Sequence, residues 1–143
     1  MSITPGHLGA WLIKGNADAG ALVERFRAEP RVHTWCVRPS YRTRLMVAGQ
    51  PVVFWASGSR SRTVRYGVWG VGQLTGVAVS GDGESWSVPL DLEILPERQR
   101  LARALLRADP RLARAEVLRQ PMGSNPSFLT PEEFAALREH LPQ

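Results

Sequence analysis

Few side chains in this sequence have the types and spacing that covalent catalysis requires. Cys36 is the single cysteine and follows His33 by three residues, but residues three apart on a strand point to opposite faces, and no positioned acid follows them. The run Ser57-Gly58-Ser59 lacks the Gly-x-Ser-x-Gly frame of a nucleophile elbow, and the glycine-rich run 67–72 lacks the Lys-Ser/Thr pair and following helix of a phosphate-binding loop. We therefore predict that the protein is not an enzyme.

Metal and disulfide chemistry are equally poorly supported. The three histidines, His7, His33 and His140, are far apart in the chain, and with one cysteine they leave no spacing typical of a zinc site. A single cysteine also excludes an intramolecular disulfide. We expect a reduced, cytoplasmic protein that binds no metal and no cofactor.

Positive charge is concentrated in one part of the chain. The sequence has 18 Lys plus Arg against 13 Asp plus Glu, a net charge of +5, and Lys14 is its only lysine. No acidic residue lies between Glu29 and Asp82, whereas seven arginines do, and such a stretch favours phosphate binding. The alternative is a solvated basic face with ion pairs to acids elsewhere in the fold. The candidate phosphate-binding residues are Arg38, Arg42, Arg44, Arg60, Arg62 and Arg65.

Tryptophan is the second unusual feature. Five tryptophans accompany only two tyrosines and four phenylalanines, and all five lie in or beside predicted strands. A large ring most often fills a core, but a domain of 143 residues is too small to bury five indoles comfortably and give each N–H a partner. We expect some of these rings to line a cleft. An indole wall beside a basic surface has the composition needed to stack an unpaired base and attract its phosphates.

Strands are predicted to dominate the first two thirds of the chain. Alternation, β-prone residues and turn signals favour strands at 10–14, 34–37, 51–56, 66–79 and 85–95, with the third and fourth paired antiparallel. A basic loop is expected from Pro39 to Gln50.

Helices are predicted around 21–28, ended by Pro30, and over 97–108, where Leu101 and Leu105 share one side. The last helix is signalled by Thr130-Pro131-Glu132-Glu133, which provides an N-cap threonine, a proline at the first position and a glutamate three after the cap. The fold class is therefore α+β, a small curved or barrel-like sheet with flanking helices.

The chain is expected to form one domain over residues 1–143, because no repeat, low-complexity tract or linker of domain-boundary length occurs. The N-terminal residues show no signal-peptide pattern, and no apolar run is long enough to cross a membrane.

Five short segments, in this order and spacing, resemble the successive blocks of the EVE domain: Ala10–Asn16, Thr34–Val37, Gly49–Gly58, Tyr66–Gly72 and Gly123–Thr130. EVE domains are grouped with YTH and ASCH domains in the PUA-like superfamily, so the resemblance implies a small β-barrel flanked by helices. EVE domains are associated with modified bases, notably modified cytosine in DNA. The resemblance thus implies a non-catalytic module that holds a modified, flipped or single-stranded base of a nucleic acid in an aromatic pocket.

The resemblance to YTH domains also implies roles for individual residues. In those domains an Ile-Lys-Ser-Asn block is followed by a cage tryptophan, which points to Asn16 as a partner of the base edge and Trp35 as a cage wall. Cys36 stands where YTH domains have a small polar residue, and Trp55 and Trp86 are both candidates for a second wall. Ser57 and Asn125 complete the predicted pocket, although the Asn125-Pro126 loop could instead cap the last helix.

Three further questions remain open at this stage. An ASCH-like hydrolase of small modified nucleosides is an alternative, but it would need a Lys/Thr/Glu set. Lys14 is the only lysine, and no glutamate lies between Glu29 and Glu84. A protein-interaction subunit with a basic face is a second alternative. The sequence does not choose between DNA and RNA. The expected oligomeric state is a monomer or weak dimer, with no membrane contact.

Overall fold

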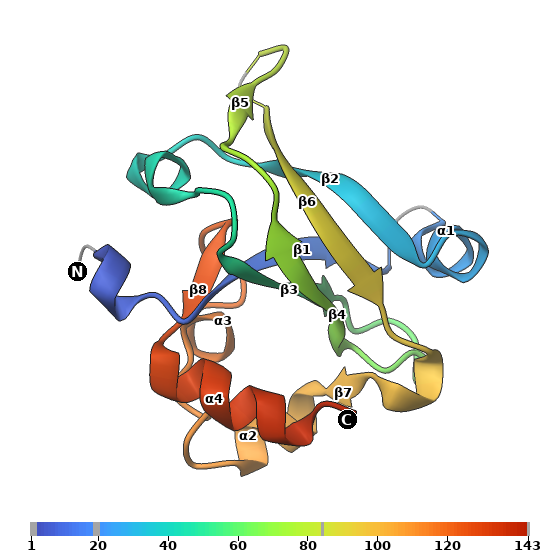
Figure 1. Cartoon of the computed structure of the whole chain (residues 1–143). Coiled ribbons are helices and arrows are strands. Elements are labelled where there is room, and N and C mark those ends of the chain that lie inside the picture. Colours follow the sequence, from blue (N-terminus) through green and yellow to red (C-terminus); the bar gives the residue numbers. More distant parts are fainter. Residues whose placement is uncertain (1–2, 19–20, 84, 143) are drawn as a thin grey trace.

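A curled mixed sheet forms the centre of the computed structural model, which describes residues 3–18, 21–83 and 85–142 (Figure 1). Hydrogen-bonded neighbours in the sheet follow the order β2-β6-β4-β3-β1-β8, while β5 pairs with β6 and β7 with β4. The strands are β1 (Ala10–Asn16), β2 (Arg31–Val37), β3 (Pro51–Ser57), β4 (Gly67–Leu74), β5 (Val79–Ser80), β6 (Trp86–Ile94), β7 (Leu101–Ala102) and β8 (Ser127–Leu129).

The helices lie around the sheet. Helix α1 stands alone beside β2, at the right of Figure 1, whereas α2, α3 and α4 gather below the sheet. Their bounds are α1 (Leu22–Ala28), α2 (Arg103–Ala108), α3 (Glu116–Arg119) and α4 (Pro131–His140), and three 3-10 helices are η1 (Pro5–His7), η2 (Tyr41–Leu45) and η3 (Glu97–Gln99). The predicted α+β class with a strongly curved sheet is confirmed.

Both faces of the central strands are buried. On β1, Trp11 and Ile13 enter the core inside the curl, and Ala10 and Leu12 enter a second core beneath α2, α3 and α4. Strand β3 alternates in the same way, with Phe54 in the first core and Trp55 in the second. Successive side chains of a strand point to opposite faces, so a strand covered on both sides is a nearly continuous apolar run.

The pairing of β1 determines which strand ends lie next to each other. It runs parallel to β3, with Trp11 opposite Val52 and Asn16 opposite Ser57, and antiparallel to β8. The carboxyl ends of β1 and β3 therefore meet at the same edge of the sheet. The remaining central pairs, β3 with β4, β4 with β6 and β2 with β6, are antiparallel.

The last helix begins as its sequence predicts. The Thr130 hydroxyl accepts a hydrogen bond from the Glu133 backbone N–H, and the Glu133 carboxylate accepts one from the Thr130 N–H. This reciprocal capping box, with proline at the first helical position, confirms the predicted helix start.

The helix predicted over 97–108 is wrong in its first half. Residues 97–99 form a 3-10 turn and Leu101–Ala102 pair with β4, so the α-helix begins only at Arg103. Leu101 is buried but Leu105 is exposed, and Leu106 provides the buried contact of α2. Strand β4 pairs with β6 only from Gly70 onward, so its edge at Gly67 and Val68 is open, and pairing with that edge outweighed helical periodicity for Leu101 and Ala102.

Two smaller corrections concern loops and strand length. The segment predicted as a loop after Pro39 contains η2, whose start is capped by Ser40. The long strand predicted over 66–79 ends at Leu74, and Val79–Ser80 forms a separate short strand on β6.

Candidate functional site

Trp35 on β2 has a half-buried indole held in a fixed orientation. Its ring packs edge-to-face on Phe54, with centroids 4.8 Å apart at 86°, and lies 6.1 Å from the ring of Phe26. The indole N–H donates to the backbone carbonyl of Lys14 at 2.9 Å. A ring fixed in this way, with part of its surface still open, is suited to stack against a planar ligand without further ordering.

A cleft of about 330 Å³ opens beside this ring, and it is lined by Gly15, Asn16, Ala21, Leu22, Arg25 and Trp35. We call it the Trp35 cleft. The Arg25 guanidinium carbon lies 5.5 Å from the centroid of the Trp35 ring, within the range of a cation–π contact. Gly15 is required beneath the ring, because a Cβ there would lie 2.9 Å from the Trp35 ring and 2.6 Å from that of Phe54.

Asn16 lies at the rim of the Trp35 cleft, at the end of β1. Its side-chain oxygen accepts from the Asp18 N–H at 2.8 Å. The Asp18 carboxylate in turn accepts hydrogen bonds from the Tyr66 hydroxyl and from the backbone N–H groups of Ser59 and Arg60. These donors, the Tyr66 hydroxyl first, hold the pKa of Asp18 below its ordinary value. The loop that carries Arg60 is thereby tied to the rim.

Asn125 connects three segments next to the Trp35 cleft. Its side-chain oxygen accepts from the Lys14 N–H at 3.3 Å, its side-chain N–H donates to the Cys36 carbonyl at 3.4 Å, and its own carbonyl accepts from the Arg38 N–H at 2.8 Å. It lines a second cavity, of about 720 Å³, together with Cys36, Arg38 and Ser85. The Asn125 loop therefore borders a cavity, while the cap of the last helix is Thr130.

Cys36 does not line the Trp35 cleft. It follows Trp35 directly on β2, so its exposed thiol leaves the opposite face of the strand and opens on the cavity bordered by Asn125. His33 is also exposed, beside an irregularity in the β2–β6 register between Val32 and Thr34.

The two candidates for a second aromatic wall lie elsewhere. Trp55 is only 2% exposed and is packed in the core beneath α2, α3 and α4, so its predicted role in the pocket is corrected. Trp86 is half-buried on β6, opposite Val37, and is not part of the lining of the Trp35 cleft. The group that faces the Trp35 ring is Arg25, and no pattern in the sequence selects it.

Ser57 and Lys14 lie close to the site, but their polar groups are already bonded. Ser57 is opposite Asn16 in the strand register, and its hydroxyl donates to the Gly15 carbonyl at 3.2 Å. The Lys14 ammonium donates to the Pro121 carbonyl at 3.3 Å. Burial lowers the pKa of Lys14, and the opposing charge of Glu116 does not fully offset that effect.

The six arginines predicted to bind phosphate do not form one surface. Arg38 lines the cavity of Asn125, Arg44 is exposed on η2, and Arg60 and Arg62 are exposed on the loop before β4. Arg65 ends that loop and donates to the Arg100 carbonyl at 3.2 Å.

Arg42 must be removed from the predicted phosphate-binding set. It is 7% exposed and pairs with both carboxylate oxygens of Glu116 at 2.7 Å, while it also donates to the Pro126 carbonyl. The hydrogen bond to Glu116 is the main reason why the pKa of Arg42 is raised. A charge neutralised inside the fold is not available to a phosphate.

The described residues form neither a metal-ligand cluster nor a membrane-spanning helix. In residues 3–18, 21–83 and 85–142, no three His, Cys, Asp or Glu side chains are grouped closely enough to hold a metal ion. Within the same ranges, no helix has the length and apolar character needed to cross a membrane.

Comparison with known proteins shows the fold alone. No family model and no curated protein matches this sequence. The chain is similar in structure to a Pseudomonas putida protein (17% identity, TM-score 0.64, 92% of this chain and 98% of that chain covered) and a Pseudomonas syringae protein (18%, 0.63, 92% and 99%). A hypothetical protein from Leishmania major is similar to the same degree (17%, 0.63, 93% and 94%). The whole curled-sheet arrangement therefore recurs in solved structures.

Proposed function

We propose that this chain is a non-catalytic, EVE-like and PUA-like module that binds a modified base of a nucleic acid in the Trp35 cleft. The observation that carries the proposal is the Trp35 ring itself, half-exposed, fixed by its bond to Lys14 and faced by the Arg25 guanidinium. Arg25 is exposed, so its side chain can move outward from its position 5.5 Å from the ring, and a base that then enters stacks on the indole with the guanidinium on its other face. The curled sheet with outer helices is the arrangement that a PUA-like domain requires.

Asn16 supplies the edge contact in this proposal. Its side-chain oxygen is used by the Asp18 N–H, which leaves the amide N–H₂ to donate to an acceptor on the base. Modified cytosine, with its carbonyl and ring nitrogen, is a ligand of this kind. The exposed Arg60 and Arg62, on the loop tied to Asp18, attract the phosphates that flank the base.

Isothermal titration of folded variants with a short oligonucleotide, carrying one modified cytosine or none, tests the proposal. Stacking contributes about 1–3 kcal/mol per base, so Trp35→Ala weakens binding of the modified strand roughly five- to 150-fold. The unmodified strand changes much less. Asn16→Ala reduces the preference for the modified strand, because it removes an edge contact and leaves attraction to phosphate intact.

Trp86→Ala is the matched control, because Trp86 is the other half-buried tryptophan and does not line the cleft. It should bind both strands as the parent does. Equal binding of every strand by Trp35→Ala and by the parent would refute the proposal. Arg60→Ala with Arg62→Ala should reduce the salt dependence of binding without changing the preference among bases.

A hydrolase of small acylated nucleosides is the second candidate, favoured by one observation. Lys14, half-buried, lies near enough to Glu116 for their charges to interact. Against it, Glu116 is already bonded to both terminal nitrogens of Arg42 and to Ser127. Release of the free nucleoside from N-acylated cytidine, lost in Lys14→Ala, would establish this activity.

A further inference from the structure

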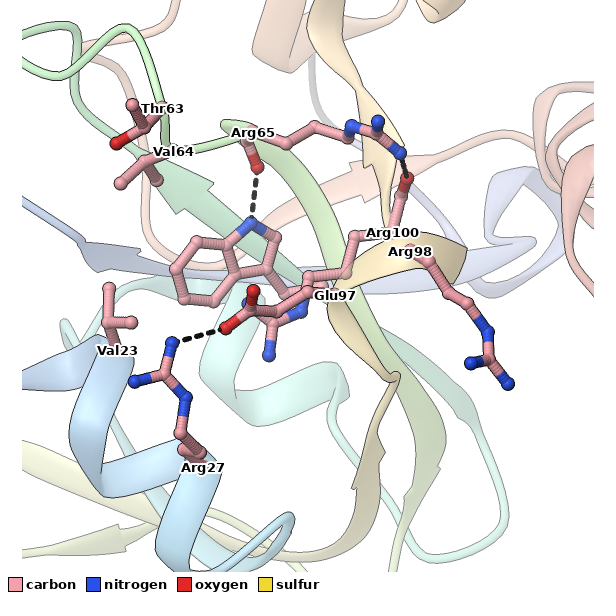
Figure 2. A pocket seen from close by; sticks show the side chains of 9 residues that line it. Val23, Arg27, Thr63, Val64, Arg65, Glu97, Arg98 and Arg100 are labelled. Carbon is pink, nitrogen blue, oxygen red and sulfur yellow. Dashed lines mark hydrogen bonds and ion pairs between the residues drawn. The ribbon is translucent and has the colours of Figure 1, made fainter.

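A third pocket lies on the other side of α1 from the Trp35 cleft, and Figure 2 shows it. Its volume is about 540 Å³, and it shares no lining residue with the Trp35 cleft. Side chains reach it from α1, from the loop before β4 and from the turn of η3. Four of them are arginines, Arg27, Arg65, Arg98 and Arg100, and one is a carboxylate, Glu97.

Arg100 and Trp69 form the floor of this pocket. The Arg100 guanidinium carbon lies 4.3 Å from the centroid of the Trp69 ring, and its Nε donates to the Leu95 carbonyl at 3.0 Å. Arg100 is only 8% exposed, yet within residues 3–18, 21–83 and 85–142 no carboxylate oxygen lies within 4.0 Å of it. Glu97 lies near enough for its charge to act on Arg100 but not in contact with it. A buried charge without a counter-ion in contact is costly, and it attracts an anion from solution.

Among the described residues, the two terminal nitrogens of Arg100 have no hydrogen-bond partner. No fully buried side-chain nitrogen there lacks a partner, so each of the two keeps some contact with solvent, although the residue as a whole is buried. Five N–H donors in a planar fork match the oxygens of a phosphate, and one of the five is used by Leu95.

Charged side chains at the rim of the pocket can also contact a ligand. Arg27 donates to Glu97 at 2.7 Å across the mouth, as the dashed line in Figure 2 shows, and both side chains are more than half exposed. Exposed ion pairs of this kind are weak, so Arg27 can exchange Glu97 for a ligand oxygen. Arg98 also lines the pocket, but Figure 2 shows that its guanidinium points away from Arg27 and Glu97, so this exposed side chain must turn inward to reach a ligand. It has no ion-pair partner among the described residues.

We propose that this pocket binds a phosphate group, with Arg100 as the central donor and Arg98 and Arg27 at the rim. The lining has a net charge of three positive, which suits the two negative charges of a phosphate monoester better than a single carboxylate. The proposal goes beyond base binding, because it requires neither Trp35 nor a base.

The indole N–H of Trp69 is a direct reporter for this proposal. It donates to the Arg65 carbonyl at 2.6 Å, so a ligand that displaces Arg65 or Arg100 changes its environment. In a titration with inorganic phosphate, followed by ¹H–¹⁵N spectra, the Trp69 indole signal should shift and saturate. Chloride at equal ionic strength should not reproduce the shift.

Arg98→Ala should weaken phosphate binding by about tenfold, since hydrogen bonds between charged groups are among the stronger ones. Arg107→Ala is the matched control, because Arg107 is exposed on α2 and outside the pocket. Saturable binding that is weakened by Arg98→Ala alone supports the proposal. A Trp69 signal that responds to phosphate no more than to chloride, or equal weakening by both substitutions, overturns it.

A 5′-phosphorylated oligonucleotide identifies the source of the phosphate. If it displaces inorganic phosphate from the pocket lined by Trp69 and Arg100, the site serves a nucleic acid. If it moves only the Trp35 indole signal, the site serves a small phosphorylated molecule. Both results support a phosphate site, and the response of Trp35 reports separately on base binding.

Discussion

Two buried arginines, Arg42 and Arg100, show how one side chain can serve different purposes in the same fold. Both are less than a tenth exposed, and both lie over aromatic rings, Arg42 near Phe128 and Arg100 over Trp69. Arg42 has a two-point ion pair with Glu116, whereas Arg100 has only a backbone carbonyl and the indole face. Burial lowers the pKa of Arg100, while the bond to Glu116 raises that of Arg42.

The difference indicates which arginine is structural and which is available for binding. A guanidinium that is matched by a buried carboxylate adds no free charge to the surface, and its loss leaves the carboxylate without a partner. A guanidinium that is desolvated without a partner lowers the free energy of unfolding of the protein. An anion that binds to it raises that free energy again. Position in the sequence does not reveal this, because Arg42 lies in the acid-free stretch and Arg100 lies three residues after Glu97.

The largest expected effect comes from replacing each arginine with methionine. Arg42→Met leaves Glu116 charged and unpaired, which should lower the free energy of unfolding by about 3–5 kcal/mol. Arg100→Met removes a desolvated charge and keeps apolar contact with Trp69, so its effect should stay within about 1 kcal/mol. Urea unfolding followed by circular dichroism measures both, and equal losses would remove the distinction between them.

The second prediction concerns pH. Burial raises the pKa of Glu116, but hydrogen bonds from Arg42 and Ser127 outweigh it and leave the pKa below the ordinary value. The stability from this pair is therefore complete above the pKa of an unfolded glutamate, about 4.3, and is lost as the pH falls through the lower folded value. Between pH 7 and pH 3, Glu116→Gln should lose less stability than the parent. Arg100→Met should keep the parental dependence.

The third prediction concerns ligand linkage. Phosphate at ten times its dissociation constant should raise the free energy of unfolding by about 1.4 kcal/mol, because it binds only the folded chain. Arg42→Met should retain this increment despite its lower stability, and Arg100→Met should lose it. Thermal unfolding in phosphate and in chloride of equal ionic strength makes the measurement. An increment that survives in Arg100→Met would assign it to another site.

The smallest effects are expected at two arginines of α1 that face different sites. Arg25→Ala should weaken binding of the modified base about two- to fivefold, the value of an exposed cation–π contact, and leave phosphate binding unchanged. Arg27→Ala should weaken phosphate binding by no more than about fivefold and leave base binding unchanged. Titration of each variant with each ligand gives four values, and any other pattern would show that the two pockets are not independent.

Much of the sheet was predictable because local signals agreed with its final environment. The runs at 10–14 and 51–56 are strands with both faces buried, and Thr130 caps its helix as the sequence indicates. The prediction of a helix over 97–108 is wrong in its first half. Leu101 and Leu105 have helical spacing, but the edge of β4 pairs with Leu101 as a strand. Periodicity contains no information about an unpaired edge elsewhere.

The candidate site was less predictable. The sequence predicts one pocket that contains Trp35, Asn16 and Asn125. The structure places Asn16 with Trp35 in one cleft and Asn125 in the neighbouring cavity. The sequence also predicts Trp55 and Arg42 as binding residues. The alternation of β3 instead turns Trp55 into the core beneath α2, α3 and α4, and Glu116 neutralises Arg42. Both outcomes depend on partners distant in sequence, as does the position of Arg25 over Trp35.

The pairing of β1 with β8 has a consequence for synthesis on the ribosome. The first and last strands of the sheet are neighbours, and Asn125 bonds to Lys14, 111 residues earlier in the chain. Contacts this distant form late and slow the folding of a domain, since a long loop must close before they contribute. A nascent chain that has not reached residue 129 cannot complete the pairing of β1 with β8, although every residue that lines the Trp35 cleft has already been made. Truncated translation products should therefore be less stable than the finished protein, because one edge of β1 has no partner strand.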